Sequence, residues 1–124
     1  MKTLLRLIAA AAFASLVGAS AVHAQSHDWP TRPVRIIVPA PPGGGYDNTI
    51  RPLAQDLALQ LRQPVVIENK PGAGNIIGTQ AGATALPDGY TLTMTGMLNT
   101  IAQGIYERVP FDIVSDFAHI AAIG

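Results

Sequence analysis

Two short runs of mostly β-branched residues are each followed by a glycine-rich loop and a helical pattern, and this repeated order is the strongest constraint on the fold. Residues 34–38 (VRIIV) and 65–69 (VVIEN) predict strands. The loops after them, residues 39–45 and 71–75, hold too much Pro and Gly for the interior of a helix or strand. Repeated strand–loop–helix units favour an α/β fold with a parallel sheet and right-handed crossovers.

An apolar stripe predicts an amphipathic helix after the first of these loops. Its apolar residues recur at steps of three and four, so they share one face, which we expect to turn toward a core. Three residues are candidate caps, and Pro52 favours the two later ones, because it then falls in the first turn. The stripe consists of Ile50, Leu53, Leu57 and Leu61, and the candidate caps are Asp47, Asn48 and Thr49.

The rest of the chain predicts four more elements, and three loops are expected to meet at one edge of the sheet. Residues 76–86 and 99–106 predict short helices, and residues 90–95 and 117–123 predict a third and a fourth strand. The carboxyl ends of parallel strands share an edge, and ligands bind outside it. The loops expected there are the first loop (residues 39–45), the second loop (residues 71–75) and the third loop (residues 96–99).

Three consecutive glycines, residues 43–45, lead directly into the predicted amphipathic helix. Without side chains, their backbone N–H groups can approach a ligand closely, and the helix start adds a partial positive charge. Such a loop suits a carboxylate, phosphate or sulfate. A tight turn that requires a positive φ is the alternative interpretation.

The second loop has a spacing near that of a dinucleotide-binding fingerprint. Its glycines are Gly72, Gly74 and Gly78, which depart from the G-x-G-x-x-G pattern. The next strand ends in Met94 and Thr95, where a ribose-binding acid is expected in that motif. The sequence therefore argues against a nucleotide site.

The composition excludes several kinds of site. The chain has no Cys, which removes disulfides, thiolate metal sites and Cys nucleophiles. Eight Lys and Arg residues balance eight Asp and Glu residues, without the basic excess of a nucleic-acid-binding protein. His119 stands alone, Ser115 lacks a G-x-S-x-G setting, and the acids are dispersed. We expect no catalytic residue, no metal site and no cofactor.

Residues 1–24 are expected to be a cleavable signal peptide rather than part of the fold. Lys2 and Arg6 precede an almost wholly apolar run, residues 7–17, and small residues lead to a cleavage site after Ala24. The run is too short to span a bilayer. We therefore expect a periplasmic protein formed by residues 25–124, in a compartment that does not supply ATP or recycle NAD(P)H.

Six stretches in register resemble the Bug-type periplasmic receptors, which are the extracytoplasmic substrate-binding proteins of tripartite tricarboxylate transporters. Any one stretch is weakly specific, but together they extend over residues 29–124. They are residues 29–39 (WPTRPVRIIVP), 42–47 (PGGGYD), 63–74 (QPVVIENKPGAG), 77–79 (IGT), 87–92 (PDGYTL) and 109–112 (VPFD), followed by Asp116 and Phe117.

The resemblance implies a two-lobed, type II-like binding protein with a cleft between α/β lobes, of which this chain holds an incomplete first lobe. It implies a monomer that captures a small carboxylated solute and presents it to the membrane subunits of the transporter, with no enzyme activity. The ligand-binding role maps onto the three loops, with Asp47 capping the helix or ordering a water. The mapped residues are Pro42, Gly43, Gly44, Gly45, Asp47, Gly72, Ala73, Gly74, Thr95, Gly96 and Asn99.

Two other hypotheses stay open on the sequence. The chain is shorter than family members, so a non-binding, truncated remnant of such a receptor is the first alternative. A small α/β enzyme that acts on a phosphorylated or nucleotide ligand is the second, and the glycine loops alone support it.

Overall fold

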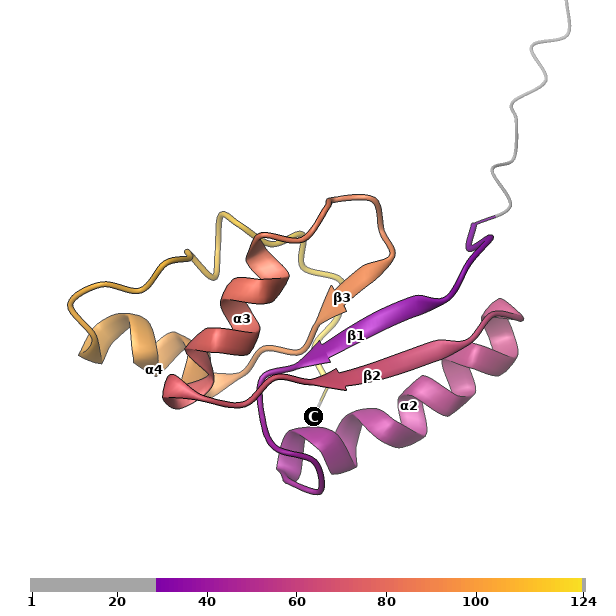
Figure 1. Cartoon of the computed structure of the whole chain (residues 1–124), viewed down its shortest axis with the longest axis horizontal. Helices are drawn as coiled ribbons and strands as arrows, with labels where there is room; N and C mark the ends of the chain where they lie inside the picture. The colour runs from indigo at the N-terminus through magenta and orange to yellow at the C-terminus, as the bar shows by residue number, and fades with distance from the viewer. Residues whose placement is uncertain (1–28, 124) are drawn as a thin grey trace, which may run out of the picture.

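The computed structural model describes residues 29–123, and the predicted signal peptide lies outside them. Three parallel strands form a sheet in the order β2-β1-β3. Both strand pairs leave their carboxyl ends at one edge, as Figure 1 shows. The strands are β1 (Val34–Val38), β2 (Val65–Asn69) and β3 (Thr91–Thr93). The predicted strands at residues 34–38 and 65–69 are confirmed, and the third is shorter than predicted.

Helices cover both faces of the sheet (Figure 1). On one face, Ile36 and Val38 of β1 pack against Ile50 and Ala54 of the long helix in one buried cluster. Ile37 points to the opposite face, because side chains alternate along a strand. Among the described residues, no helix is both long and apolar enough to cross a membrane. The helices are α2 (Gly45–Leu61), the 3₁₀ turn η1 (Ala73–Asn75), α3 (Ile76–Ala83) and α4 (Met97–Ile105).

Helix α2 begins earlier than the apolar stripe and Pro52 predict. Gly44 is its N-cap residue, so none of the three predicted caps is correct, and Pro52 lies in the helix interior. The glycines explain the early start: Gly43 turns the chain with a φ of +78°, and Gly44 is extended (φ −74°, ψ 176°), so the helix begins immediately. The stripe is also narrower than predicted, because Leu53 is exposed.

The predicted fourth strand is wrong. Residues 117–123 are irregular, and they line a groove of about 1070 Å³ together with residues of α2 and β3. A strand needs the backbone of a neighbour, and in the described part of the chain β3 pairs only with β1. The groove lies between these residues and β3. The backbone of residues 117–123 therefore has no neighbouring strand to pair with, although its composition is typical of a strand.

The two short helices deviate only at their ends. Helix α3 stops at Ala83, three residues before the predicted end, and α4 runs over Met97–Ile105 rather than 99–106. Helix α3 lies directly on the end of β1 because Gly78 lacks a side chain. A Cβ at Gly78 would lie 2.6 Å from Pro39 Cα and 2.6 Å from the Lys70 carbonyl oxygen. This close approach brings α3 to the edge of the sheet where the loops lie.

Asp47 holds the first loop to the sheet. Its buried carboxylate accepts hydrogen bonds from the Gly43 amide (2.8 Å), from Arg51 Nε (2.7 Å) and Nη2 (3.1 Å), and from Asn69 Nδ2 (3.0 Å). These donors come from the loop, from α2 and from the end of β2. The hydrogen bonds from Arg51, then Gly43 and Asn69, lower the pKa of Asp47 from 3.8 to about 2, against the opposing effect of burial.

We predict that Gly78→Ala destabilises the fold by about 1–3 kcal/mol, because its Cβ would overlap backbone atoms that cannot swing away. Gly104→Ala in α4 is the matched control: its Cβ meets open space, and Ala favours a helix over Gly. Chemical denaturation followed by circular dichroism measures both variants. Equal stabilities for the two would contradict the close packing of α3 on β1.

We predict that Asp47→Asn lowers the melting temperature by several degrees at pH 7. The folded-state pKa is depressed, so the ionised carboxylate stabilises the fold fully above the unfolded pKa of 3.8 and loses this effect as the pH falls toward about 2. The difference between wild type and variant should therefore shrink over that pH range. Asp56→Asn, at an exposed carboxylate of the same helix, is the control and should leave the melting temperature at pH 7 close to that of wild type.

Candidate functional site

The three loops meet at the carboxyl edge of the sheet, as the topology predicts. Asn69 at the end of β2 donates to the Ala40 carbonyl of the first loop (3.0 Å). The Tyr46 hydroxyl, one residue beyond the first loop, donates to Asn99 Oδ1 at the end of the third loop (3.4 Å). A Cβ on Gly74 of the second loop would lie 3.3 Å from the hydroxyl of Tyr106, the residue after α4. The edge is therefore one continuous surface.

The first loop presents free backbone donors. Within the described residues, no acceptor is found for the amides of Gly45, Tyr46 and Asp47, which begin α2. Pro42, Gly43 and Gly45 are exposed, and Gly44 is half-buried. A side chain on Gly45 would meet open space. The start of α2 thus combines unpaired N–H groups with the positive end of a 17-residue helix.

Asp47, by contrast, is buried beneath the first loop. All of its hydrogen bonds run to groups of this chain, and Arg51 neutralises its charge in an ion pair of 2.7 Å. The carboxylate therefore does not present a negative surface to a ligand above the loop. Its position is the third residue of α2 rather than the N-cap, so it stabilises the helix start by accepting the Gly43 amide instead.

The second loop has an unusual backbone. Gly72, Ala73, Gly74 and Asn75 all have positive φ values, of 130°, 48°, 61° and 74°. Non-glycine residues adopt such values rarely, and runs of them mark functional or strained segments. Gly72, Ala73 and Gly74 are exposed. Among the described residues, Asn75 Nδ2 is the one buried side-chain polar atom without a hydrogen-bond partner.

The third loop ends in a buried cap. The backbone amide of Gly96 donates to Asn99 Oδ1 (2.9 Å), and the backbone amide of Asn99 donates to the Gly96 carbonyl (3.0 Å). These two hydrogen bonds cap the N-terminus of α4. Asn99 Nδ2 donates to Thr79 Oγ1 of α3. Thr95 and Gly96 are half-buried, whereas Asn99 is fully buried. Of the predicted site residues, Asp47 and Asn99 therefore have buried side chains, and the others are exposed or half-buried.

Sequence reasoning missed the residues that join the loops. Tyr46, Asn69 and Thr79 contact segments far away along the chain, and no local pattern marks such contacts. Arg51 could have been found, since an acid and a base four residues apart on a helix form a common pair. The unpartnered amide of Asn75 had no sequence signal.

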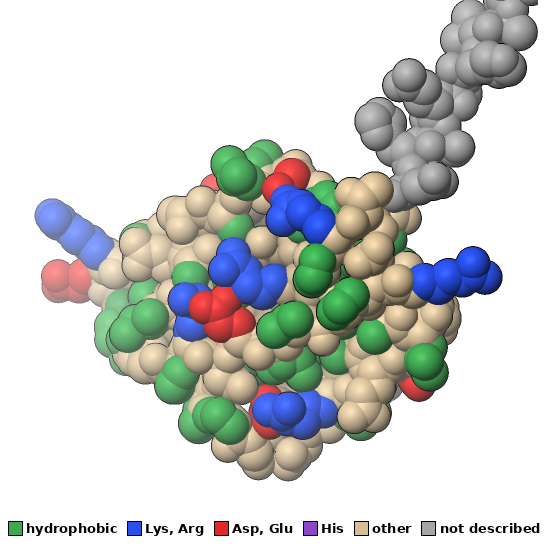
Figure 2. All heavy atoms as spheres, turned by 45° about the vertical axis from the view of Figure 1, so that its right-hand side comes forward, with side chains coloured by type: hydrophobic (Ala, Val, Ile, Leu, Met, Phe, Trp, Pro, Cys, Tyr) green, Lys and Arg blue, Asp and Glu red, His purple; other side chains and the backbone are tan. Residues whose placement is uncertain are grey.

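Most charged side chains of residues 29–123 are paired with an opposite charge. The four ion pairs of the described residues join Arg32 to Asp88, Arg35 and Lys70 to Glu68, and Arg51 to Asp47. The glutamate's ion pair and hydrogen bond with Lys70 lower the pKa of Glu68, with a smaller contribution from Arg35. Figure 2 shows acidic and basic side chains side by side on the face it presents. In the part of the chain that the structure describes, no group of His, Cys, Asp or Glu could hold a metal.

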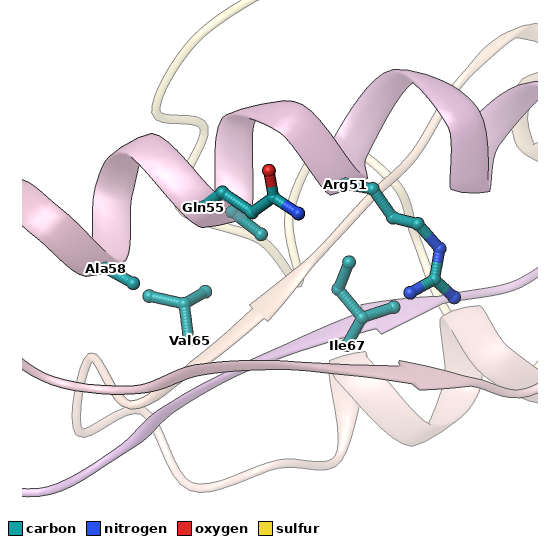
Figure 3. Close-up of a pocket in the computed structure, with 6 residues that line it drawn as sticks. Arg51, Gln55, Ala58, Val65 and Ile67 are labelled. Atoms are coloured by element: carbon teal, nitrogen blue, oxygen red, sulfur yellow. The ribbon is translucent and has the colours of Figure 1, made fainter.

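A second groove, of about 290 Å³, lies away from the glycine residues. Figure 3 shows Arg51, Gln55 and Ala58 of α2 facing Val65 and Ile67 of β2 across it. Arg51 is already bonded to Asp47, and the lining combines the polar side chain of Gln55 with apolar side chains of α2 and β2.

The fold is similar to that of solved periplasmic proteins. A periplasmic transporter matches with a TM-score of 0.62 and 39% identity, over 68% of this chain and 29% of that chain. The periplasmic binding protein BugD matches with a TM-score of 0.51 and 48% identity, over 52% of this chain and 22% of that chain. The predicted α/β lobe of a periplasmic binding protein, present in part, is thereby confirmed.

Sequence relatives agree with the structural neighbours. A UPF0065 protein of Bordetella pertussis is 46% identical over 114 residues, which are 90% of this chain and 33% of the relative. Protein BugT of the same organism is 40% identical over 98 residues, which are 77% of this chain and 30% of BugT. This chain spans about a third of the length of the curated relatives that it matches.

The family model for the receptor of the tripartite tricarboxylate transporter family, TctC, matches residues 49–124. This match covers the larger part of the chain and confirms the resemblance seen in the motifs. The chain belongs to the TctC receptor family, of which it represents an N-terminal portion.

Proposed function

We propose that this chain forms the first lobe of a periplasmic solute receptor that binds a small carboxylated solute and presents it to the membrane subunits of a tripartite transporter. The observation that carries the proposal is the set of unpaired amides of Gly45, Tyr46 and Asp47 at the exposed start of α2. The receptor acts as a monomer and does no chemistry on the solute.

The electrostatics of the edge favour an anion. Backbone N–H groups at a helix start bind carboxylates by hydrogen bonds and by the partial charge of the helix. The nearest acid, Asp47, is buried and paired with Arg51, so it does not repel an anion above the loop. The donors are fixed before the ligand arrives, because Asp47 holds the Gly43 amide from below.

The proposed contacts come from all three loops. Residues 42–45 line the position of the carboxylate, which accepts hydrogen bonds from the free amides at the start of α2, and Gly72, Ala73 and Gly74 form the second wall. Thr95 and Gly96 offer hydrogen bonds to the remainder of the solute. The buried side chains of Asp47 and Asn99 keep the predicted site in shape instead of touching the solute, whereas the backbone amide of Asp47 stays among the proposed donors.

Export is part of the proposal. We propose that residues 1–24 are removed as a signal peptide and that the receptor works in the periplasm. The order of charged, apolar and small residues supports this interpretation, as do the periplasmic structural neighbours.

We predict that Gly45→Asp abolishes carboxylate binding while the fold stays intact. The new carboxylate would lie at the open amides, and an acid in the first turn of a helix is stabilising. Amide chemical shifts of residues 43–47 are followed by nuclear magnetic resonance during titration with citrate, succinate and glutamate. Wild type should bind at least one of them with an affinity of about millimolar.

The controls separate charge from size. Gly45→Asn has nearly the same volume without charge and should retain binding. Titration of the wild type with glucose should move none of these resonances. Equal binding by the Asp and Asn variants, or no response of wild type to any of the three carboxylates, would refute the proposed function.

A further inference from the structure

One chain of side-chain hydrogen bonds touches all three loops. It starts at the Tyr46 hydroxyl, which donates to Asn99 Oδ1 (3.4 Å) next to the first and third loops. Asn99 Nδ2 donates to Thr79 Oγ1 on α3, and the Thr79 hydroxyl donates to the carbonyl oxygen of Asn75 in the second loop (2.8 Å). These hydrogen bonds join Tyr46 to Asn99, 53 positions apart along the chain, and Asn99 to Thr79, 20 positions apart.

The centre of this chain is shielded from water. Asn99 and Thr79 are both fully buried, so water cannot replace a bond that breaks between them. A buried donor left without a partner is costly, and a fully satisfied network selects one arrangement of the groups that it joins. Both polar atoms of the Asn99 side chain take part, because Oδ1 also accepts the backbone amide of Gly96.

Packing supports the same link. A Cβ on Gly96 would collide with the hydroxyl and ring of Tyr46, so this aromatic ring lies directly against the backbone of the third loop. Tyr46 itself carries one of the free amides at the start of α2. A displacement of the third loop must therefore displace the residue that presents a proposed ligand donor.

We propose that Asn99 is a positioning residue that, through Tyr46 and Thr79, holds the three loops at one spacing and couples their movements. The inference rests on the proposed function for its biological meaning, since the spacing matters only if the loops share a ligand. The coupling itself is a property of the free chain and is tested without a ligand.

We predict that Thr79→Val accelerates hydrogen exchange of the Gly43 and Gly44 amides several-fold, although Thr79 does not touch the first loop. Exchange is measured residue by residue on the ligand-free chain by nuclear magnetic resonance. Thr79→Ser, which keeps the hydroxyl, should restore wild-type rates. The matched control is Thr84→Val, which removes a hydroxyl bonded to the Gln80 carbonyl (2.9 Å) on α3 without a link to any loop.

A double-mutant cycle tests the route of the coupling. In a Tyr46→Phe background, Thr79→Val should add little to the exchange of Gly43 and Gly44, because the link is already broken. Unchanged rates at Gly43 and Gly44 in folded Thr79→Val would overturn the proposal. An equal acceleration by Thr84→Val would also overturn it, since general destabilisation would then explain both.

If Thr79→Val fails to fold, Tyr46→Phe tests the chain from the other end. It should accelerate exchange of the Gly96 amide, whereas Tyr90→Phe, at the opposite end of the sheet, should not. An unchanged Gly96 rate in Tyr46→Phe would refute the coupling. Citrate titration of wild type is scored separately: a response without coupling refutes only this inference, and coupling without any response to the carboxylates refutes only the proposed function.

Discussion

The buried carboxylate of Asp47 is the interaction on which the edge of this lobe depends. It accepts hydrogen bonds from the first loop, from α2 and from the end of β2, so a single charge fixes three segments relative to one another. A buried charge is tolerated only where partners surround it, and Arg51 and Asn69 supply them. Asp47 accepts the Gly43 amide and the Pro41 carbonyl accepts the Gly44 amide, so the free amides are those of Gly45, Tyr46 and Asp47 at the start of α2.

The free donors at the start of α2 belong to the backbone. The cationic side chains of the four described ion pairs are occupied by acids, whereas the amides at the start of α2 have no acceptor among the described residues. Backbone donors have one geometry and are positioned by the chain itself. The side chains around them can then vary without loss of the donors, provided that the glycines keep the surface open.

Much of the fold could be predicted from the sequence, because β1 and β2 are local runs of β-branched residues. The meeting of three loops followed from a rule of parallel sheets rather than from any residue. The start of α2 could not be predicted from its apolar stripe, since the turn at Gly43 and Gly44 decides it. The fourth strand failed because strand formation depends on a neighbour that composition does not reveal. Asn99 and Thr79 meet across 20 residues, and only the folded chain brings them together.

The side of β3 that faces away from β1 affects the tendency of this polypeptide to aggregate during purification. Among the described strands β3 pairs only with β1, so the backbone groups on its other side, beside the large apolar groove, have no strand partner. Such an edge is a template onto which another extended polypeptide can add. Purification yield should therefore depend on concentration, with dilute, cool conditions favouring dispersed molecules over fibrillar deposits.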